Sequence, residues 1–209
     1  MNVVDLGRME YASAVEEMQK ILRQRIEGHI PDTLLLCEHE PVYTVGRTRG
    51  AGANVVAPGN VPVIEVARGG DVTFHGPGQI VGYPIFQLPE HRHDLHGFMR
   101  GLEEMMIRTL AHFELEGVRD DRNTGVWVNG SKMMAIGIGA KRWVTWHGFA
   151  LNHTVELDFF RRINPCGMDA HLVTRMADHL DPLPTREAVT TIIIEELTRW
   201  WQDWTAPRG

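Results

Sequence analysis

The sequence predicts an α+β fold in which a mixed, largely antiparallel sheet is flanked by helices. Segments with strand character and segments with helix character do not alternate strictly, which disfavours a parallel βαβ sheet. In addition, Asn129-Gly130 stands between two apolar runs, and this dipeptide is the strongest short-range signal of a β-hairpin. The length of 209 residues fits one domain spanning 1–209.

The N-terminal part is expected to be a short strand followed by a helix. Residues 2–6 are a short apolar run that Gly7 ends. Apolar side chains then recur three or four residues apart, which predicts one face of a helix that Gly28 terminates. This stripe consists of Tyr11, Val15, Met18, Leu22 and Ile26.

Strands are expected to dominate the next part of the chain. Residues 32–40 are a nearly continuous apolar run bounded by prolines, which is typical of a buried strand. Further strands are predicted over 42–47 and 61–67, with a glycine- and alanine-rich loop over 47–60 between them.

The second half is expected to contain two helices around a three-stranded meander. Asp94 fits the N-cap of a helix that runs to Gly117, and Thr185 fits the N-cap of a helix that closes the chain. Between them, the hairpin at Asn129-Gly130 and a second bend near Lys141-Arg142 predict three antiparallel strands. The apolar stripe of the first helix comprises Leu95, Phe98, Met99, Leu102, Met105, Met106 and Phe113.

Composition limits the function classes. The net charge of −6 gives no general affinity for nucleic acids or membranes. No apolar run approaches the ~20 residues of a membrane span, and the N-terminus lacks the pattern of a secretory signal, so we expect a cytoplasmic protein. Cys37 and Cys166 form neither a disulfide framework nor a metal motif, and the histidines of residues 91–96 match no common metal site.

One stretch combines strand residues with many glycines: RGGDVTFHGPGQIVGYPI, over residues 68–85. Alternate strand residues share a face, so Thr73 and His75 should point together toward a cavity or solvent, and Val72 and Phe74 toward the core. The flanking glycines let a ligand approach the backbone, whose N–H groups suit an anion or oxyanion. Ordinary turns at the strand ends explain the same glycines.

Cys166 and Lys132 carry the most reactive chemistry. Cys166 lies in NPCGM, where Pro165 and Gly167 predict a tight turn, and Lys132 is the only charge in a run that follows the hairpin. A buried small hydrophobe and a solvated lysine are the simpler interpretations. If the two side chains met, they would form a nucleophile and its base.

Several motifs resemble the LipB family of lipoyl(octanoyl) transferases. The 68–85 stretch is similar to the family's signature, and EHEPVYTVGR to the segment before it. GSKMMAIGIGAKRWVTWHGFALN resembles the lysine-bearing hairpin, and INPCGM the cysteine turn. These blocks span residues 38–168 in the family's order.

The resemblance implies the fold of biotin and lipoate protein ligase catalytic domains. It also implies an acyltransferase that moves an octanoyl or lipoyl group from acyl carrier protein to a lysine, without a cofactor or a metal ion. The acceptors would be lipoyl domains of 2-oxoacid dehydrogenase E2 subunits and the glycine cleavage H protein. Cys166 would carry the acyl group as a thioester, with Lys132 as its partner.

The resemblance further implies three substrate-binding segments. Carried over residue by residue, they are Arg68, Gly69, Gly70, Asp71, Val72, Thr73, Phe74 and His75, then Ala135, Ile136 and Gly137, then Gly148, Phe149 and Ala150. Because the carrier is acidic and this chain is net negative, we expect a local basic patch at the cavity mouth; the candidates are Arg161 and Arg162, Lys141 and Arg142, and Arg47 and Arg49.

Three other interpretations stay open. One is an ATP-dependent lipoate or biotin ligase on the same fold, against which Asp71 stands where lipoate ligases carry a further glycine. Another is an amidotransferase that relays octanoyl groups between lipoyl domains through a cysteine thioester. The third is a non-catalytic module that binds the carrier.

Overall fold

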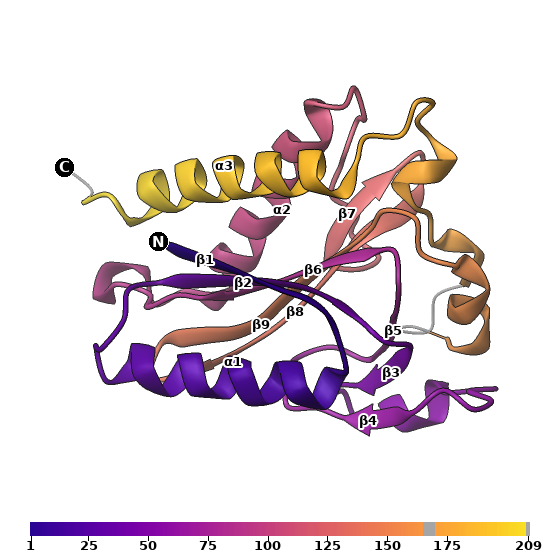
Figure 1. Ribbon diagram of the computed structural model, residues 1–209, viewed down its shortest axis with the longest axis horizontal. Coiled ribbons are helices and arrows are strands. Elements are labelled where there is room, and N and C mark those ends of the chain that lie inside the picture. The colour runs from indigo at the N-terminus through magenta and orange to yellow at the C-terminus, as the bar shows by residue number, and fades with distance from the viewer. Residues whose placement is uncertain (165–169, 208–209) are drawn as a thin grey trace.

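The computed structural model describes residues 1–164 and 170–207 of the chain. The described residues form a six-stranded sheet in the order β1-β2-β6-β9-β8-β7 (Figure 1). Only β1 and β2 pair in parallel, and the other neighbours are antiparallel, which confirms the mixed, largely antiparallel sheet. The strands are β1 Asn2–Met9, β2 Thr33–His39, β6 Gln79–Ile85, β7 Gly125–Val128, β8 Ser131–Lys141 and β9 Val144–Asn152.

A second sheet of three short strands lies beside the first, in the order β4-β3-β5. Its strands are β3 Val42–Val45, β4 Val63–Glu65 and β5 Val72–His75. The strand predicted over 61–67 corresponds to β4, which is shorter than predicted. Val72 and Phe74 point into the core of this sheet with Tyr43 and Phe160, as the alternation predicted.

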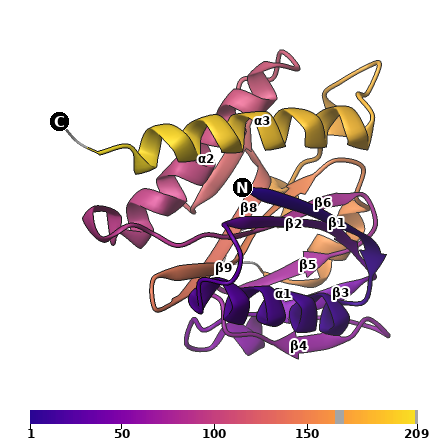
Figure 2. The ribbon, with the colours of Figure 1, turned by 60° about the vertical axis from the view of Figure 1, so that its left-hand side comes forward.

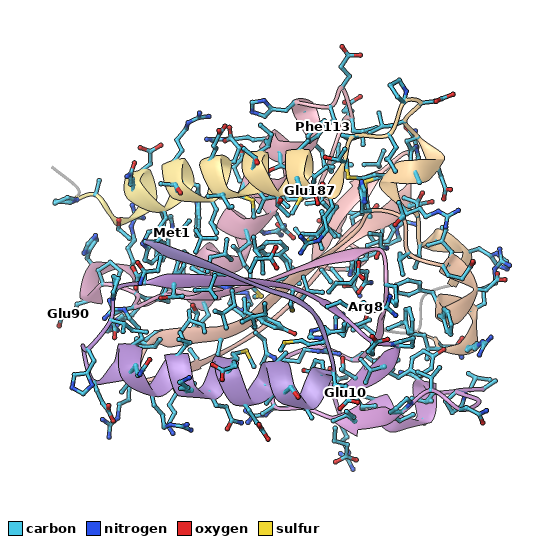
Figure 3. All side chains as sticks on the ribbon, viewed as in Figure 1. Met1, Arg8, Glu10, Glu90, Phe113 and Glu187 are labelled. Atoms are coloured by element: carbon cyan, nitrogen blue, oxygen red, sulfur yellow. The ribbon has the colours of Figure 1, made fainter. Side chains whose placement is uncertain are left out.

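Helices cover both faces of the large sheet (Figures 1 and 2). Helix α1, Tyr11–Ile26, lies on one face, and α2, Leu95–Ala111, packs with α3, Arg186–Thr205, on the other. Side chains fill the space between these layers (Figure 3). In the described residues, no helix is both long and apolar enough to cross a membrane.

Strand β2 shows why its sequence is a continuous apolar run. Leu34 and Leu36 pack into the core under α2 and α3, whereas Leu35 and Cys37 pack under α1. Both faces of the strand are buried, so alternation with polar residues is lost. Cys37 is fully buried, in agreement with its interpretation as a small hydrophobe.

The predicted caps are confirmed. Asp94 accepts a hydrogen bond from the Gly97 N–H at 2.9 Å, and Thr185 accepts one from the Ala188 N–H at 3.2 Å. Both side chains satisfy amide groups that have no partner inside the helix.

Two predicted element ends were wrong. Helix α2 stops at Ala111 rather than at Gly117, because the chain turns at Glu114, which has a φ of 59°. Strand β1 continues past Gly7 to Met9, because Gly7 (φ 65°) lies in a bulge between Asp5 and Arg8 and does not end the pairing.

The meander is confirmed, and its first turn lies at Asn129-Gly130. Both turn residues have positive φ, 50° and 78°, as a two-residue type I′ turn requires. The second turn, at Arg142-Trp143, lies one residue later than predicted, with φ values of 51° and 59°. These turns place Lys132 near the start of β8 and His147 in the middle of β9.

Candidate active site

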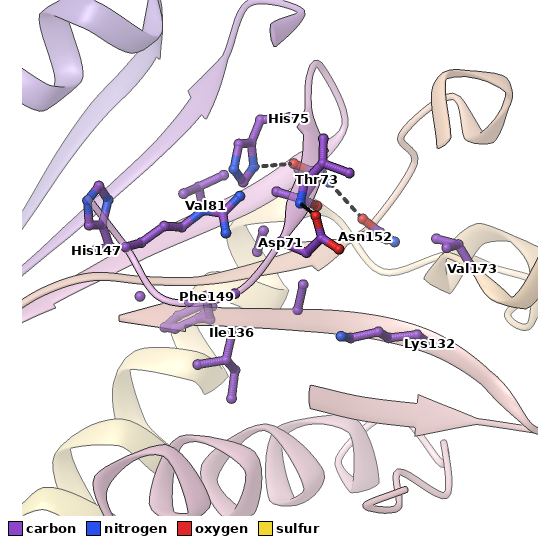
Figure 4. A pocket seen from close by; sticks show the side chains of 18 of the residues that line it. Asp71, Thr73, His75, Val81, Lys132, Ile136, His147, Phe149, Asn152 and Val173 are labelled. Carbon is purple, nitrogen blue, oxygen red and sulfur yellow. Dashed lines mark hydrogen bonds between the residues drawn. The ribbon is translucent and has the colours of Figure 1, made fainter. Parts of the chain in front are cut away.

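A cavity of about 100 Å³, open to solvent on part of its surface, lies between the small sheet and the strands β6, β8 and β9 (Figure 4). Lys132 and Val173 lie toward one end of it, and His147 lies at the other (Figure 4). Apolar side chains of the face that carries Tyr83, among them Val81 and Ala150, line the part between them. The cavity thus joins a cationic group to an apolar channel.

The structure brings three predicted segments together around this cavity. The segment 68–75 comes from β5 and the turn before it, the segment 135–137 from β8, and the segment 148–150 from β9. The predicted residues that line the cavity are Arg68, Gly70, Asp71, Val72, Thr73, His75, Lys132, Ala135, Ile136, Gly137, Gly148, Phe149 and Ala150. Gly69 and Phe74 were also predicted to bind substrate, but they are not among the residues that line the cavity in the described part of the chain.

Those two residues have other contacts. The Gly69 N–H donates to the Ile138 carbonyl at 3.0 Å, so this amide is already paired. The Gly78 N–H likewise donates to a Glu38 carboxylate oxygen at 2.9 Å. Phe74 is fully buried and stacks on Phe159 with ring centroids 4.5 Å apart. A glycine-rich sequence therefore does not by itself show that the backbone N–H groups are available to bind an oxyanion.

Arg68 is a buried cation whose guanidinium is held by the small sheet. Its Nη2 donates to the carbonyl and hydroxyl oxygens of Thr44, both at 2.8 Å, and its Nη1 donates to the Gly69 carbonyl at 3.0 Å. The side chain fixes the turn before β5 against β3 and places a positive charge beside the cavity.

Asp71 closes the same turn. One carboxylate oxygen accepts from the Asn54 amide at 2.6 Å, and the other accepts from the Val72 N–H at 2.7 Å. Because Asn54 lies within the glycine- and alanine-rich loop over 47–60, this pair ties that loop to the cavity wall.

Lys132 lies in a defined position at its end of the cavity. Its Nζ donates to the Asn123 side-chain carbonyl at 2.7 Å. Asn123 itself lines the cavity, although no local sequence signal marked it.

The backbone of Lys132 anchors the chain that follows the segment containing Cys166. The Thr174 N–H donates to the Lys132 carbonyl at 3.0 Å, and the Asn152 amide donates to the Thr174 carbonyl at 2.9 Å. Cys166 lies outside the described residues. On either side of it, Phe160 and Val173 line the cavity.

Gly137 and Gly148 pair across β8 and β9 in the cavity wall. A Cβ at Gly148 would lie 2.1 Å from the Gly82 carbonyl oxygen, and one at Gly137 would lie 2.8 Å from Cδ of Arg68. The strands approach neighbouring groups so closely that glycine is required at these two positions.

At the far end of the cavity two imidazole rings lie within the influence of the Arg68 charge and are themselves neutral. Burial lowers the pKa of His147 to about 3, with a smaller contribution from the Arg68 charge. Burial, followed by the charges of His39 and Arg68, holds the pKa of His75 well below its usual value. Both rings are therefore neutral at pH 7.

The hydrogen bonds also fix the tautomer of His75. Gln79 Nε2 donates to the Phe74 carbonyl and to the Asn152 side chain, so Gln79 Oε1 is an acceptor. His75 Nδ1, 3.1 Å away, must carry the proton and donate to it.

A second layer of polar groups supports this end. His39 Nε2 lies 2.6 Å from the Tyr83 hydroxyl, and burial lowers the pKa of His39 to about 4. Tyr11 from α1 stacks on His75 with ring centroids 6.1 Å apart. Tyr11 and Tyr83 both line the cavity, so polar atoms from α1 and β6 reach it.

Sequence reasoning missed several lining residues. Four of them, Gln79, Tyr83, His147 and Asn152, stand inside the quoted motifs but were assigned no role there. Tyr11, Asn123, Phe160 and Val173 lie outside those motifs, and only the tertiary fold brings them to the cavity.

Comparison with known proteins agrees with this arrangement. Residues 10–198 match the model of the lipoyl protein ligase A/B catalytic domain family. An octanoyltransferase of Geobacter metallireducens is 48% identical over 185 residues, which cover 88% of this chain and 86% of the relative. An octanoyltransferase of Rubrobacter xylanophilus is 49% identical over 181 residues, covering 83% and 81% respectively.

Solved structures share the fold at low sequence identity. A lipoate-protein ligase A bound with ATP superposes with a TM-score of 0.75 at 14% identity, covering 96% of this chain and 85% of the other. A biotin protein ligase from Aquifex aeolicus superposes with a TM-score of 0.59 at 10% identity, covering 98% and 70%. The predicted biotin and lipoate ligase fold is thus confirmed, and the chain belongs to the octanoyltransferases of the lipoyl protein ligase A/B catalytic domain family.

Proposed function

We propose that this chain, acting as one catalytic domain, transfers an octanoyl group from acyl carrier protein to a lysine of a lipoyl domain. Cys166 carries the group as a thioester, and Lys132 moves the protons. The acceptors are the lipoyl domains of 2-oxoacid dehydrogenase E2 subunits and the glycine cleavage H protein. No ATP is required, because the donor is a thioester and the product is a more stable amide.

One observation carries this proposal. The cavity joins Lys132 to an apolar channel, and its walls continue on both sides of the segment that contains Cys166, through Phe160 and Val173. An eight-carbon acyl chain needs such an apolar channel, with its carbonyl group at the end where the nucleophile and base lie.

The first half-reaction moves the acyl group to the enzyme. The Cys166 thiolate attacks the thioester carbonyl carbon, and the bond between that carbon and the carrier sulfur breaks. The ammonium group of Lys132 gives a proton to the departing carrier thiolate.

The second half-reaction moves the acyl group to the acceptor. The acceptor amine attacks the enzyme thioester, and the neutral Lys132 amine takes a proton from the attacking nitrogen. The bond to the Cys166 sulfur then breaks, which regenerates the thiolate and releases the amide. A thiolate suits both steps because it exchanges readily with thioesters.

Arg161 and Arg162 are candidates for docking the acidic carrier. They follow Phe160, which lines the cavity, and the Arg161 side chain is 57% exposed beside Asp158. The Arg162 guanidinium lies 4.9 Å from the centroid of the Phe159 ring.

Changing both Arg161 and Arg162 to Glu should raise the KM for the carrier at low salt and leave kcat nearly unchanged, because surface charges act mainly on the encounter of the two proteins. Lys20→Glu, on the exposed side of α1, is the matched control; an unchanged KM in the double variant would contradict this docking role.

A donor comparison tests the proposed reaction. The protein is mixed with an unmodified lipoyl domain and either octanoyl-carrier protein alone or octanoate with ATP and Mg²⁺. We expect octanoylated lipoyl domain only with the carrier thioester. Modification that depends on ATP, with none from the thioester, would instead identify a ligase.

A further inference from the structure

The Nζ group of Lys132 has a side-chain partner that the catalytic motifs do not include. Asn123 Oδ1 accepts a hydrogen bond from it at 2.7 Å, and both side chains line the cavity. Asn123 lies in the turn before β7, whereas Lys132 lies on β8. The contact therefore depends on how firmly that turn is held.

The turn is held by the groups around Asn123. Its N–H donates to the Asp120 carbonyl at 3.3 Å, and its carbonyl accepts from the indole N–H of the fully buried Trp127 at 3.2 Å. Arg122 binds the Asp120 carboxylate through Nε and Nη2, at 2.8 Å and 2.7 Å, and its guanidinium lies 4.4 Å from the Trp127 ring centroid. The carboxamide oxygen of Asn123 is thus presented from an anchored backbone.

The stem of Lys132 is also guided. A Cβ at Gly125 would lie 2.7 Å from Cε of Lys132, and Gly125 has a φ of 141°, which favours glycine. The Gly125 N–H donates to a carboxylate oxygen of the buried Glu103 at 3.0 Å. Glycine at this position lets the lysine stem lie directly against the strand.

The chemistry of the Asn123 side chain suits a lysine that must gain and lose a proton. Both the ammonium and the neutral amine have N–H groups, so an amide oxygen accepts from either form. A carboxylate at the same place would favour the ammonium form and weaken the base. Asparagine therefore orients the nitrogen without adding a charge that opposes deprotonation.

We propose that Asn123 is a positioning residue that orients Lys132 Nζ for proton transfer and sets its proton affinity. This inference rests on the proposed role of Lys132 as the base. Asn123 acts through the lysine and forms no bond with the acyl group.

Single-turnover transfer from preformed octanoyl-enzyme to a lipoyl domain, followed from pH 6 to pH 10, tests the inference. Asn123→Ala should slow transfer roughly 10- to 100-fold, because a small misplacement of a reacting group costs about that much. Asn123→Asp should move the acidic limb of the rate profile to higher pH by about one unit or more. Above that limb, Asn123→Asp should regain most of the rate, because the oxygen is still in place, whereas Asn123→Ala should not.

Asn129→Asp is the matched control, since it adds the same charge on the exposed turn that follows β7. It should leave the profile in place. Thermal midpoints identify any variant that loses its fold, and the isosteric Asn123→Asp decides the question if Asn123→Ala is unstable.

Wild-type rates and an unmoved profile in both Asn123 variants, with Lys132→Met inactive, would overturn this inference alone. A fully active Lys132→Met would instead overturn the proposed role of the lysine and this inference with it.

Discussion

Arg68 and Thr44 join the small sheet to the cavity through two hydrogen bonds, since Nη2 of Arg68 donates to both the carbonyl and the hydroxyl of Thr44 at 2.8 Å. Thr44 is fully buried on β3, and Arg68 is only 8% exposed. The guanidinium therefore depends on protein acceptors rather than on bulk water.

Removing the hydroxyl should destabilise this contact. Thr44→Val keeps the shape of the side chain but leaves a buried guanidinium with one acceptor fewer, which should cost about 1–3 kcal/mol of unfolding free energy. Urea unfolding at pH 7 measures the change. Thr191→Val is the control, because Thr191 is an exposed residue of α3 whose hydroxyl bonds only to its own helix. Equal stability of Thr44→Val and the wild type would show that the hydroxyl does not support Arg68.

The buried histidines predict a dependence of stability on pH. The pKa of His39 is about 4 and that of His147 about 3 in the folded chain, against about 6.5 when unfolded, because burial disfavours the charged ring. Well above pH 6.5 neither state binds these protons, so these histidines cost no stability there. As the pH falls from 6.5 toward the folded values, only the unfolded chain takes up protons, and stability falls.

The size of this effect can be measured by urea unfolding between pH 7 and pH 5. Each such histidine should contribute up to about 2 kcal/mol of loss over that range. His147→Asn removes this titrating ring and should therefore reduce the slope of stability against pH. Asparagine is chosen because it tolerates the φ of 56° at this position. The exposed His29→Asn should not alter it, and an unchanged slope in His147→Asn would contradict the assigned burial effect.

Gly137 is predicted to be intolerant of a methyl group. Gly137→Ala would place a Cβ 2.8 Å from Cδ of Arg68 and 3.2 Å from the Gly69 carbonyl oxygen. Because the hydrogen bonds of Arg68 oppose its displacement, overpacking should cost about 1–3 kcal/mol and lower the rate of acyl transfer. Thermal unfolding and transfer assays check both effects.

Gly52→Ala is the matched control, since a Cβ at this position in the exposed loop would meet nothing within 4 Å. It should change stability by less than about 0.5 kcal/mol. Equal behaviour of the two variants would show that the close approach at Gly137 has no consequence.

Local signals predicted the elements better than their junctions. Asn129-Gly130 predicted its hairpin correctly because the turn type depends on two residues that tolerate positive φ. The end of α2 was misplaced because Glu114, which has no such signal, adopts a φ of 59°. The three short strands of the small sheet pair across long stretches of intervening loop, so their separation from the large sheet could not be predicted from periodicity.

The residues of the candidate site likewise fall into two groups, those that local motifs predicted and those that only the tertiary fold brings to the cavity. The motif blocks predicted Lys132 and most of the wall from β5, β8 and β9, because these residues are adjacent in sequence. Tyr11 and Asn123 reach the cavity only through the packing of α1 and of the turn before β7. Phe74 was predicted at the site through its motif, but its alternation with Thr73 and His75 directs it into the core.

The central claim is that the acyl group passes through Cys166, and intact mass spectrometry tests it most directly. The protein is mixed with octanoyl-carrier protein in the absence of an acceptor, then measured with and without hydroxylamine, which cleaves thioesters. We predict a mass gain of one octanoyl group that hydroxylamine removes, that is lost in Cys166→Ser, and that persists in Cys37→Ser. No adduct on the wild-type chain, or an adduct that survives in Cys166→Ser, would contradict the account.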